Sequence, residues 1–212
     1  MKIVSQKGNN NMKKILLLIS NGSEILEIAP FIDVFGWSNI ISKKYEKIEV
    51  VTASFSEKNL TRISFNKLRL VSDINLNIEK INVEDYCAII IPGGFGKFGY
   101  FDDFLRVNIK KLIYDFFQSE KIIVGVCTGA IALGKIGILR EKKATTYLRE
   151  NKRYFNQLET YGAKGIYKEI VEDGNIITSS NPKTAIELAF LLLEKLTSID
   201  NRKLIEIEMG IK

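Results

Sequence analysis

The chain of 212 residues contains no histidine. Because imidazole is the usual general base for a catalytic serine or cysteine, this absence excludes Ser-His and Cys-His triads anywhere in the protein. Imidazole is also a common zinc ligand, and the two cysteines that remain, Cys87 and Cys127, do not make an ordinary zinc site alone. We therefore expect no metal and no cofactor, so that side chains other than histidine must carry any chemistry.

The two cysteines are also too few and too poorly placed for a disulfide framework. Both lie in or beside apolar runs that read as buried strands of a protein from a reducing compartment, where structural disulfides are rare. Cys87, within Asp85-Tyr86-Cys87-Ala88-Ile89, is interpreted as a small buried apolar residue.

Long apolar runs are absent as well. The run that follows Lys14 stops at Ser20-Asn21-Gly22, too soon for the core of a signal peptide, and no stretch approaches the length of a membrane span. We expect a cytoplasmic protein with no membrane partner. Residues 1–11 are predicted to be a disordered leader, residues 12–198 one domain, and residues 199–212 a helical C-terminal tail.

The charge balance is mildly basic, with a net charge of +6 and a pI near 9.1. The lysines occur as scattered pairs separated by acidic residues, and no basic stretch is interleaved with aromatic residues. This pattern is typical of a solvated surface and does not predict a nucleic-acid partner.

Apolar runs rich in β-branched residues alternate with segments of helical periodicity. The runs span residues 15–20, 48–53, 88–92, 122–126 and 176–178, and the helical segments span 24–44, 104–117 and 184–196. Continuous apolar strands that alternate with helices predict a single-domain α/β fold, a parallel sheet with helices on both faces. Residues 60–65 and 68–71, on either side of Asn66-Lys67, are predicted to form a hairpin appended to this sheet.

Cys127 lies where the run 122–126 ends and a helical segment begins. Gly125 and Gly129 flank it and allow a sharp elbow, and free N–H groups at the start of the following helix favour a thiolate. A buried core cysteine is the alternative, but the position favours a reactive thiol.

Gly93 and Gly94 end the preceding run within Pro92-Gly93-Gly94. These glycines can simply form a tight turn, but the Gly94 N–H can also join the Thr128 N–H in stabilising an oxyanion beside Cys127. Residues 94–99 match the pattern G-x-G-x-x-G, although they follow a late strand rather than a first one. We therefore interpret them as a glycine-rich loop and not as a nucleotide site.

Glu24 and Glu27 open the first long helical segment. They suit the positive end of a helix, and their spacing of three places them on one face that also carries apolar residues. A carboxyl held beside a thiol in an apolar environment is expected to be protonated, so that it can donate to the sulfur and transfer the proton that no histidine can.

Taken together, these motifs resemble the ThiJ/PfpI family, which has a flavodoxin-like, class I glutamine amidotransferase-like fold. The resemblance runs from about Lys13 to Leu196. It rests on five segments in order: residues 21–34, 91–94, 126–134, 144–147 and 177–182. It implies that Cys127 is the elbow nucleophile, Glu27 the acid that contacts it ahead of Glu24, and Gly94 and Thr128 the oxyanion donors. Gly93 and Tyr147 are expected to contact a small-molecule substrate, and a homodimer is implied.

Two departures from the family pattern narrow the expected activity. Tyr147 stands where members often have histidine, and Ser180 stands where deglycase-type members carry arginine. Glutamine amidotransferase and protease activities resemble Cys-His chemistry and are disfavoured, whereas isonitrile hydratase members do not depend on a histidine triad. The first hypothesis is that Cys127 attacks a small electrophile, namely a reactive carbonyl, its adduct or an isonitrile. The alternatives are a non-catalytic oxidation-sensing or stress-protective thiol and a scaffold that only binds.

Overall fold

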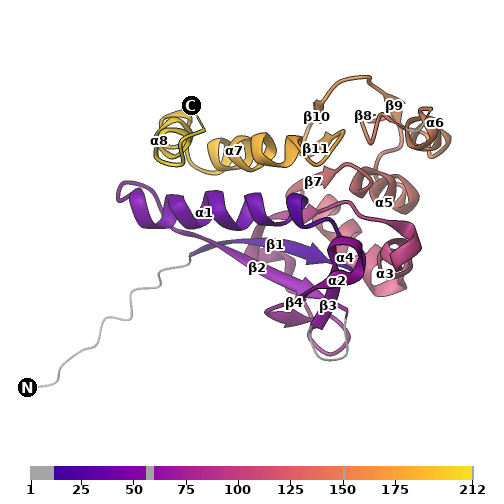
Figure 1. Cartoon of the computed structure of the whole chain (residues 1–212), viewed down its shortest axis with the longest axis horizontal. Helices are drawn as coiled ribbons and strands as arrows, with labels where there is room; N and C mark the ends of the chain where they lie inside the picture. Colours follow the sequence, from indigo (N-terminus) through magenta and orange to yellow (C-terminus); the bar gives the residue numbers. More distant parts are fainter. Residues whose placement is uncertain (1–11, 56–59, 150, 212) are drawn as a thin grey trace, which may run out of the picture.

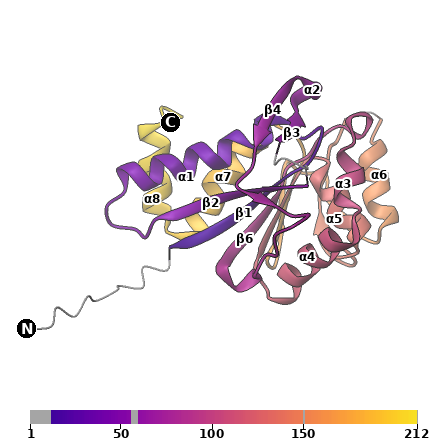
Figure 2. The same ribbon diagram turned by 90° about the horizontal axis from the view of Figure 1, so that it is seen from below.

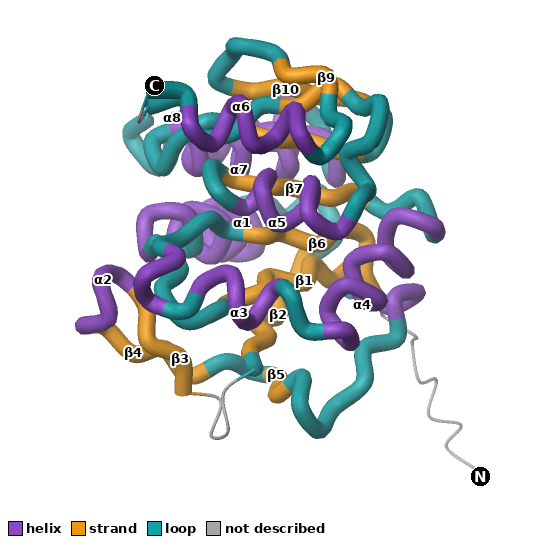
Figure 3. Tube along the Cα trace, turned by 90° about the vertical axis from the view of Figure 1, so that its right-hand side faces the viewer, coloured by secondary structure: helices purple, strands orange, loops and turns teal. Residues whose placement is uncertain are grey.

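A seven-stranded sheet runs through the middle of the protein, with helices on both faces (Figure 1). The computed structural model describes residues 12–55, 60–149 and 151–211, so the predicted leader 1–11 lies outside the described residues. Neighbouring strands are parallel, except that β10 is antiparallel to β11, and Figure 3 shows the strands arranged from β10 to β5. The strands in spatial order are β10 (Ile170–Asp173), β11 (Ile176–Ser179), β7 (Ile122–Val126), β6 (Tyr86–Ile91), β1 (Lys13–Ile19), β2 (Ile48–Ser54) and β5 (Ile74–Asn75).

The predicted α/β fold with a mostly parallel sheet is confirmed. The central strand β1 explains why its sequence is apolar without alternation: every residue from Ile15 to Ile19 is buried, because helices cover the sheet on both sides. The antiparallel strand β10 was not predicted. It joins β11 through a turn at Gly174, whose φ of +63° is a conformation that glycine adopts readily.

The helices form one layer on each face of the sheet (Figure 2). On one face lie α1 (Ala29–Ile41), α7 (Thr184–Leu196) and α8 (Ile199–Glu208), and on the other α3 (Tyr100–Phe104), α4 (Val107–Gln118) and α5 (Gly129–Ile136), with α6 (Arg153–Thr160) against α5. The described residues also include three short 3-10 helices, η1 (Ile25–Glu27), η2 (Val83–Asp85) and η3 (Gly96–Phe98).

Two of the three predicted helices need correction at their boundaries. The helix expected across 24–44 is divided into η1 and α1, because Pro30 lacks the N–H that a continuous helix needs and instead occupies the first turn of α1. The helix expected to begin at Phe104 begins at Val107, since Phe104 ends α3.

The C-terminal helix α8 is anchored to the helices beneath it. The Arg202 guanidinium is mostly buried and pairs with Glu187, Glu194 and Glu206 at 2.6 to 3.1 Å. Asn201 Nδ2 also donates to Ser38 Oγ of α1 at 3.0 Å. Because the carboxylates come from both α7 and α8, this network fixes α8 against α7.

The predicted hairpin is present, but it forms a separate two-stranded sheet. β3 (Leu60–Ile63) pairs with β4 (Leu68–Val71), and a helical turn, α2 (Ser64–Lys67), joins them, so Phe65 lies outside the strand in which it was expected. A second small sheet pairs β8 (Lys143–Ala144) with β9 (Lys164–Gly165). Within the described residues, no helix has the length and apolar character required to cross a membrane.

The helix after Cys127 packs so closely on β6 that its first residue must be glycine. A Cβ on Gly129 would overlap the carbonyl oxygen of Ile91, which is backbone and cannot move aside. We expect Gly129→Ala to lower the free energy of unfolding by about 2 kcal/mol or more, as overpacked cores do.

Gly36 of α1 is the matched control, because an added Cβ there would meet no atom within 4 Å. Gly36→Ala is expected to raise the free energy of unfolding by about 0.5–1 kcal/mol through helix propensity. Urea denaturation measures both changes, and equal effects of the two substitutions would contradict this account of packing.

Candidate active site

Cys127 lies at the elbow between β7 and α5. Its φ of +52° is uncommon for a residue with a side chain, and hydrogen bonds fix its backbone on two sides. The Cys127 N–H donates to Ser179 O at 2.8 Å, and Cys127 O accepts from Thr146 Oγ1 at 2.8 Å. The predicted sharp turn is therefore present, held by the end of β11 and by the segment that follows β8.

Glu27 is the carboxyl that reaches the thiol. It ends η1, only 1% of its surface is exposed, and its side chain hydrogen-bonds that of Cys127. The other contact of the carboxyl is with the turn after β6, where the Gly93 N–H donates to Glu27 Oε2 at 2.5 Å. Glu24, one turn earlier, is half-buried. Within the described part of the chain, its side chain acts on the sulfur through its charge and not through a hydrogen bond.

The turn after β6 is tied to the elbow by Thr128. The Thr128 hydroxyl accepts from the Gly94 N–H at 2.8 Å and donates to the Gly94 carbonyl at 2.9 Å. The Gly94 N–H, predicted as an oxyanion donor, is thus engaged by a side chain here, whereas the Thr128 N–H points to the Cys127 sulfur. Gly93, expected to contact substrate, holds Glu27 instead, and a Cβ on it would lie 2.7 Å from Glu27 Oε2.

Burial dominates the electrostatics of the Glu27–Cys127 pair. It raises the pKa of Glu27 from 4.5 to about 8, although the hydrogen bonds from Gly93 and Cys127 oppose the rise. Burial also raises the pKa of the Cys127 thiol well above its ordinary value, and the negative charge of Glu27 raises it further. The expectation that the helix N-terminus favours the thiolate is therefore corrected: the Thr128 N–H lowers this pKa, but desolvation of the nearly buried sulfur outweighs it.

A small pocket of about 200 Å³ opens beside the sulfur, and we call it the Cys127 pocket. Three aromatic side chains line it, and the Tyr147 and Tyr154 rings meet edge to face, with their centroids 6.2 Å apart. The residues that line the pocket are Glu24, Glu27, Gly94, Phe95, Cys127, Thr128, Tyr147, Tyr154 and Pro182. Of the predicted site residues, all but Gly93 are therefore brought together here.

Tyr154 of α6 is the lining residue that sequence reasoning missed. It lies outside the motifs at the strand ends, and α6 reaches the pocket only because it packs on α5. Phe95 and Pro182 also line the pocket. They directly follow Gly94 and Asn181 at the carboxyl ends of two strands, where a parallel sheet usually binds its ligand, so the sequence indicated that they lie near the site. Ser180 is buried and accepts from Asn181 Nδ2. No group of three or more potential metal-ligating side chains (Cys, Asp, Glu) occurs in the part of the chain described.

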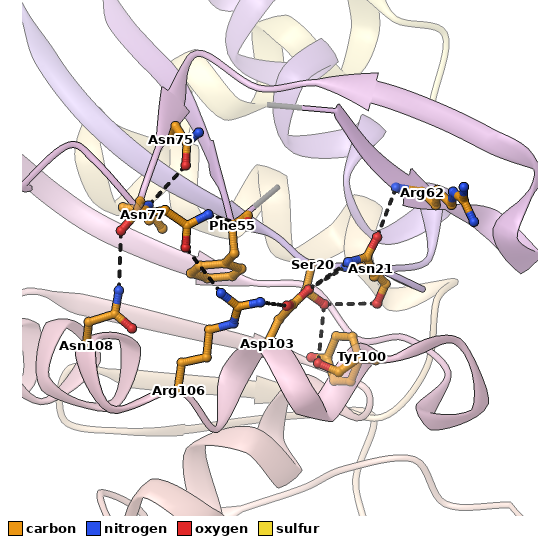
Figure 4. Close-up of polar contacts among 11 residues, drawn as sticks. Ser20, Asn21, Phe55, Arg62, Asn75, Asn77, Tyr100, Asp103, Arg106 and Asn108 are labelled. Atoms are coloured by element: carbon orange, nitrogen blue, oxygen red, sulfur yellow. Dashed lines mark hydrogen bonds and ion pairs between the residues drawn. The ribbon is translucent and has the colours of Figure 1, made fainter. Parts of the chain in front are cut away.

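A polar network at the same edge of the sheet fixes the segment that leads from β1 to Glu24 (Figure 4). The buried Asp103 carboxylate accepts from the Asn21 N–H at 2.9 Å and pairs with Arg106 at 3.2 Å. Asn21 Oδ1 in turn accepts from the Arg62 N–H, and Tyr100 donates to Pro92 O at 2.5 Å. These contacts fix the segment after β1, which leads to the two carboxyl groups, and the turn after β6, which contains the two glycines.

Comparisons with known proteins show which proteins the chain is similar to. The chain is 25% identical over 167 residues to an isonitrile hydratase of Pseudomonas putida, covering 75% of this chain and 68% of that protein. It is 26% identical over 171 residues to a deglycase of Thermococcus kodakarensis, covering 80% and 90%. The crystal structure of DJ-1beta from Drosophila melanogaster superposes with a TM-score of 0.77 at 22% identity, covering 93% of this chain and 97% of that one.

The family assignment rests on a match along most of the domain. The sequence model of the DJ-1/PfpI family matches residues 13–195, which extend from the start of β1 into the last turn of α7. The chain therefore belongs to the DJ-1/PfpI family.

Proposed function

We propose that the protein is a cysteine-dependent enzyme that acts on a small electrophile, with Glu27 as the proton partner of Cys127. The observation that carries this proposal is the hydrogen-bonded Glu27–Cys127 pair at the wall of a pocket. A volume of about 200 Å³ suits a molecule of a few non-hydrogen atoms and is below the range of drug-sized ligand sites. Reactive carbonyls, their small adducts and isonitriles meet that limit, and two relatives are named isonitrile hydratase and deglycase.

The pair can add a thiol to a carbonyl without a histidine. Glu27 as carboxylate takes the proton of Cys127 while the sulfur forms a bond to the carbonyl carbon and the C=O π electrons move to oxygen. Glu27 then returns the proton to that oxygen, so the adduct is a hemithioacetal and no charge is left over. The Glu27 pKa of about 8 suits a group that must both accept and donate protons near neutral pH. We infer that the Thr128 N–H supports the developing charge.

The oxidation-sensing alternative receives less support. Sensor thiols are exposed and have a low pKa, whereas only 7% of the Cys127 surface is exposed and burial raises its pKa.

Turnover of a panel of 2-oxoaldehydes, their thiol adducts and alkyl isonitriles tests the proposal. Cys127→Ala is expected to abolish turnover, and Glu27→Gln, which cannot transfer a proton, to lower kcat about 100-fold or more. Cys87→Ala is the matched control, because Cys87 lies at the opposite end of β6. No turnover of any compound, or equal activity of Cys127→Ala and the wild type, would refute the proposed enzymatic function.

The pH dependence of Cys127 alkylation tests the coupling within the pair. Above about pH 8 the wild-type Glu27 carboxylate opposes ionisation of the thiol, whereas glutamine stays neutral. Glu27→Gln is therefore expected to move the alkylation profile to lower pH by about one unit or more. Glu24→Gln should cause a smaller shift, since the Glu24 charge has a weaker effect on the thiol. Superimposable profiles, or a shift to higher pH, would contradict the coupling.

We also propose that two copies of the chain pair through the outer side of η1 and α1. Leu26, Ile32, Trp37 and Ile40 are all exposed along this segment, and contiguous exposed apolar surface is typical of an interface between copies of a chain. Light scattering is expected to give twice the chain mass for the wild type and for Ile78→Glu, but a lower mass for Ile40→Glu. Ile40 and Ile78 are both 79% exposed, so the two substitutions are matched. A monomeric wild type would rule this pairing out.

A further inference from the structure

The charged groups of the Cys127 pocket are all acidic. Among the described residues that line it, Glu24 and Glu27 are carboxyl groups and none is lysine or arginine. The rest of the wall consists of the aromatic rings of Phe95, Tyr147 and Tyr154 together with backbone and small side chains. Among the described lining residues, a ligand that enters this space therefore meets no cation that could neutralise a negative charge.

Hydrogen bonds fix the backbone of Glu24 beside the pocket. The Glu24 N–H donates to Gly93 O at 2.9 Å, and Glu24 O accepts from the Glu27 N–H at 3.0 Å. Ser23, just before it, forms an isolated antiparallel bridge with Gly94. The negative charge of Glu24 acts on both Glu27 and Cys127, because it raises the pKa of each. At pH 7 Glu27 is largely protonated, so Glu24 dominates the charge of the lining.

A cation touches a residue of the wall from outside the lining. The Arg153 guanidinium stacks on the Tyr154 ring, 5.1 Å from its centroid. The Arg153 side chain is exposed to solvent, where water and salt screen its charge, whereas Glu24 is half-buried and faces the pocket itself. The balance of the two therefore remains negative inside the pocket.

We propose that the Cys127 pocket selects electrophiles that carry no negative charge, and that Glu24 is the residue that determines this selectivity. The inference deepens the proposed function: it favours uncharged 2-oxoaldehydes and uncharged isonitriles as substrates and excludes 2-oxoacids, whose carboxylate would lie beside that of Glu24. It concerns which molecules reach Cys127 and not whether the enzyme turns them over.

Alkylation of Cys127 by iodoacetamide and iodoacetate measures this selectivity directly. The two reagents have nearly the same shape and differ in charge. The thiolate sulfur displaces iodide as the C–I bond breaks and takes up a carbamidomethyl group from iodoacetamide or a carboxymethyl group from iodoacetate. The rate for the Cys127 peptide is followed by mass spectrometry at pH 7, separately from Cys87. The ratio of the two rates, divided by the same ratio for 2-mercaptoethanol, removes both the thiolate fraction and the intrinsic reactivities of the reagents.

We expect this normalised ratio to favour iodoacetamide by about tenfold or more in the wild type, through repulsion in a site of low dielectric constant. In Glu24→Gln it should fall severalfold toward one. Glu208→Gln, an exposed carboxylate on α8, should leave it unchanged. A wild-type ratio near one, a ratio that Glu24→Gln does not change, or a preference for iodoacetate that Arg153→Gln abolishes would each overturn the proposal. Alkylation requires only an accessible thiol, so this result stands apart from any failure of turnover.

Discussion

The burial of the Glu27 carboxyl against the Cys127 sulfur is the constraint on which the rest of the site depends. A carboxyl that is 1% exposed is tolerated because it is largely protonated at neutral pH and because the Gly93 N–H satisfies one of its oxygens. Its pKa is higher in the folded than in the unfolded chain. It therefore favours folding at acidic pH, and this contribution is lost as the pH rises from about 4.5 through 8.

The surrounding geometry follows from that contact. The turn after β6 must bring an N–H to the carboxyl, so no side chain fits at Gly93, and Thr128 fixes the same turn by two hydrogen bonds to Gly94. The elbow must bring the thiol to the carboxyl from the other side, which requires the positive φ of Cys127. In the function that we propose, activity and stability oppose each other, since the strained residue and the buried acid together form the Glu27–Cys127 pair.

In the proposed mechanism, the Glu27 carboxyl takes the place that histidine has in Cys-His chemistry. Imidazole can change its charge near neutral pH without burial, whereas a carboxyl needs an apolar environment to raise its pKa into that range. The aromatic rings that line the pocket help to provide this environment, and Tyr147 lines it where family members often carry histidine. The same burial also raises the pKa of the thiol, and in the proposed mechanism its proton therefore passes to Glu27 and not to solvent.

Local sequence determined five strands of the large sheet (β1, β2, β6, β7 and β11), the helix α7 and the elbow at Cys127, because buried β-branched runs and flanking glycines act over a few residues. The family resemblance singled out Glu27 ahead of Glu24. Short elements such as β5, β8 and β9 have too few residues to show a period. Only the tertiary structure decided the raised pKa of the thiol, the engagement of the Gly94 N–H, the place of Tyr154 and the acidic lining of the pocket. Each depends on burial and on distances between segments far apart in the chain, which no local pattern encodes.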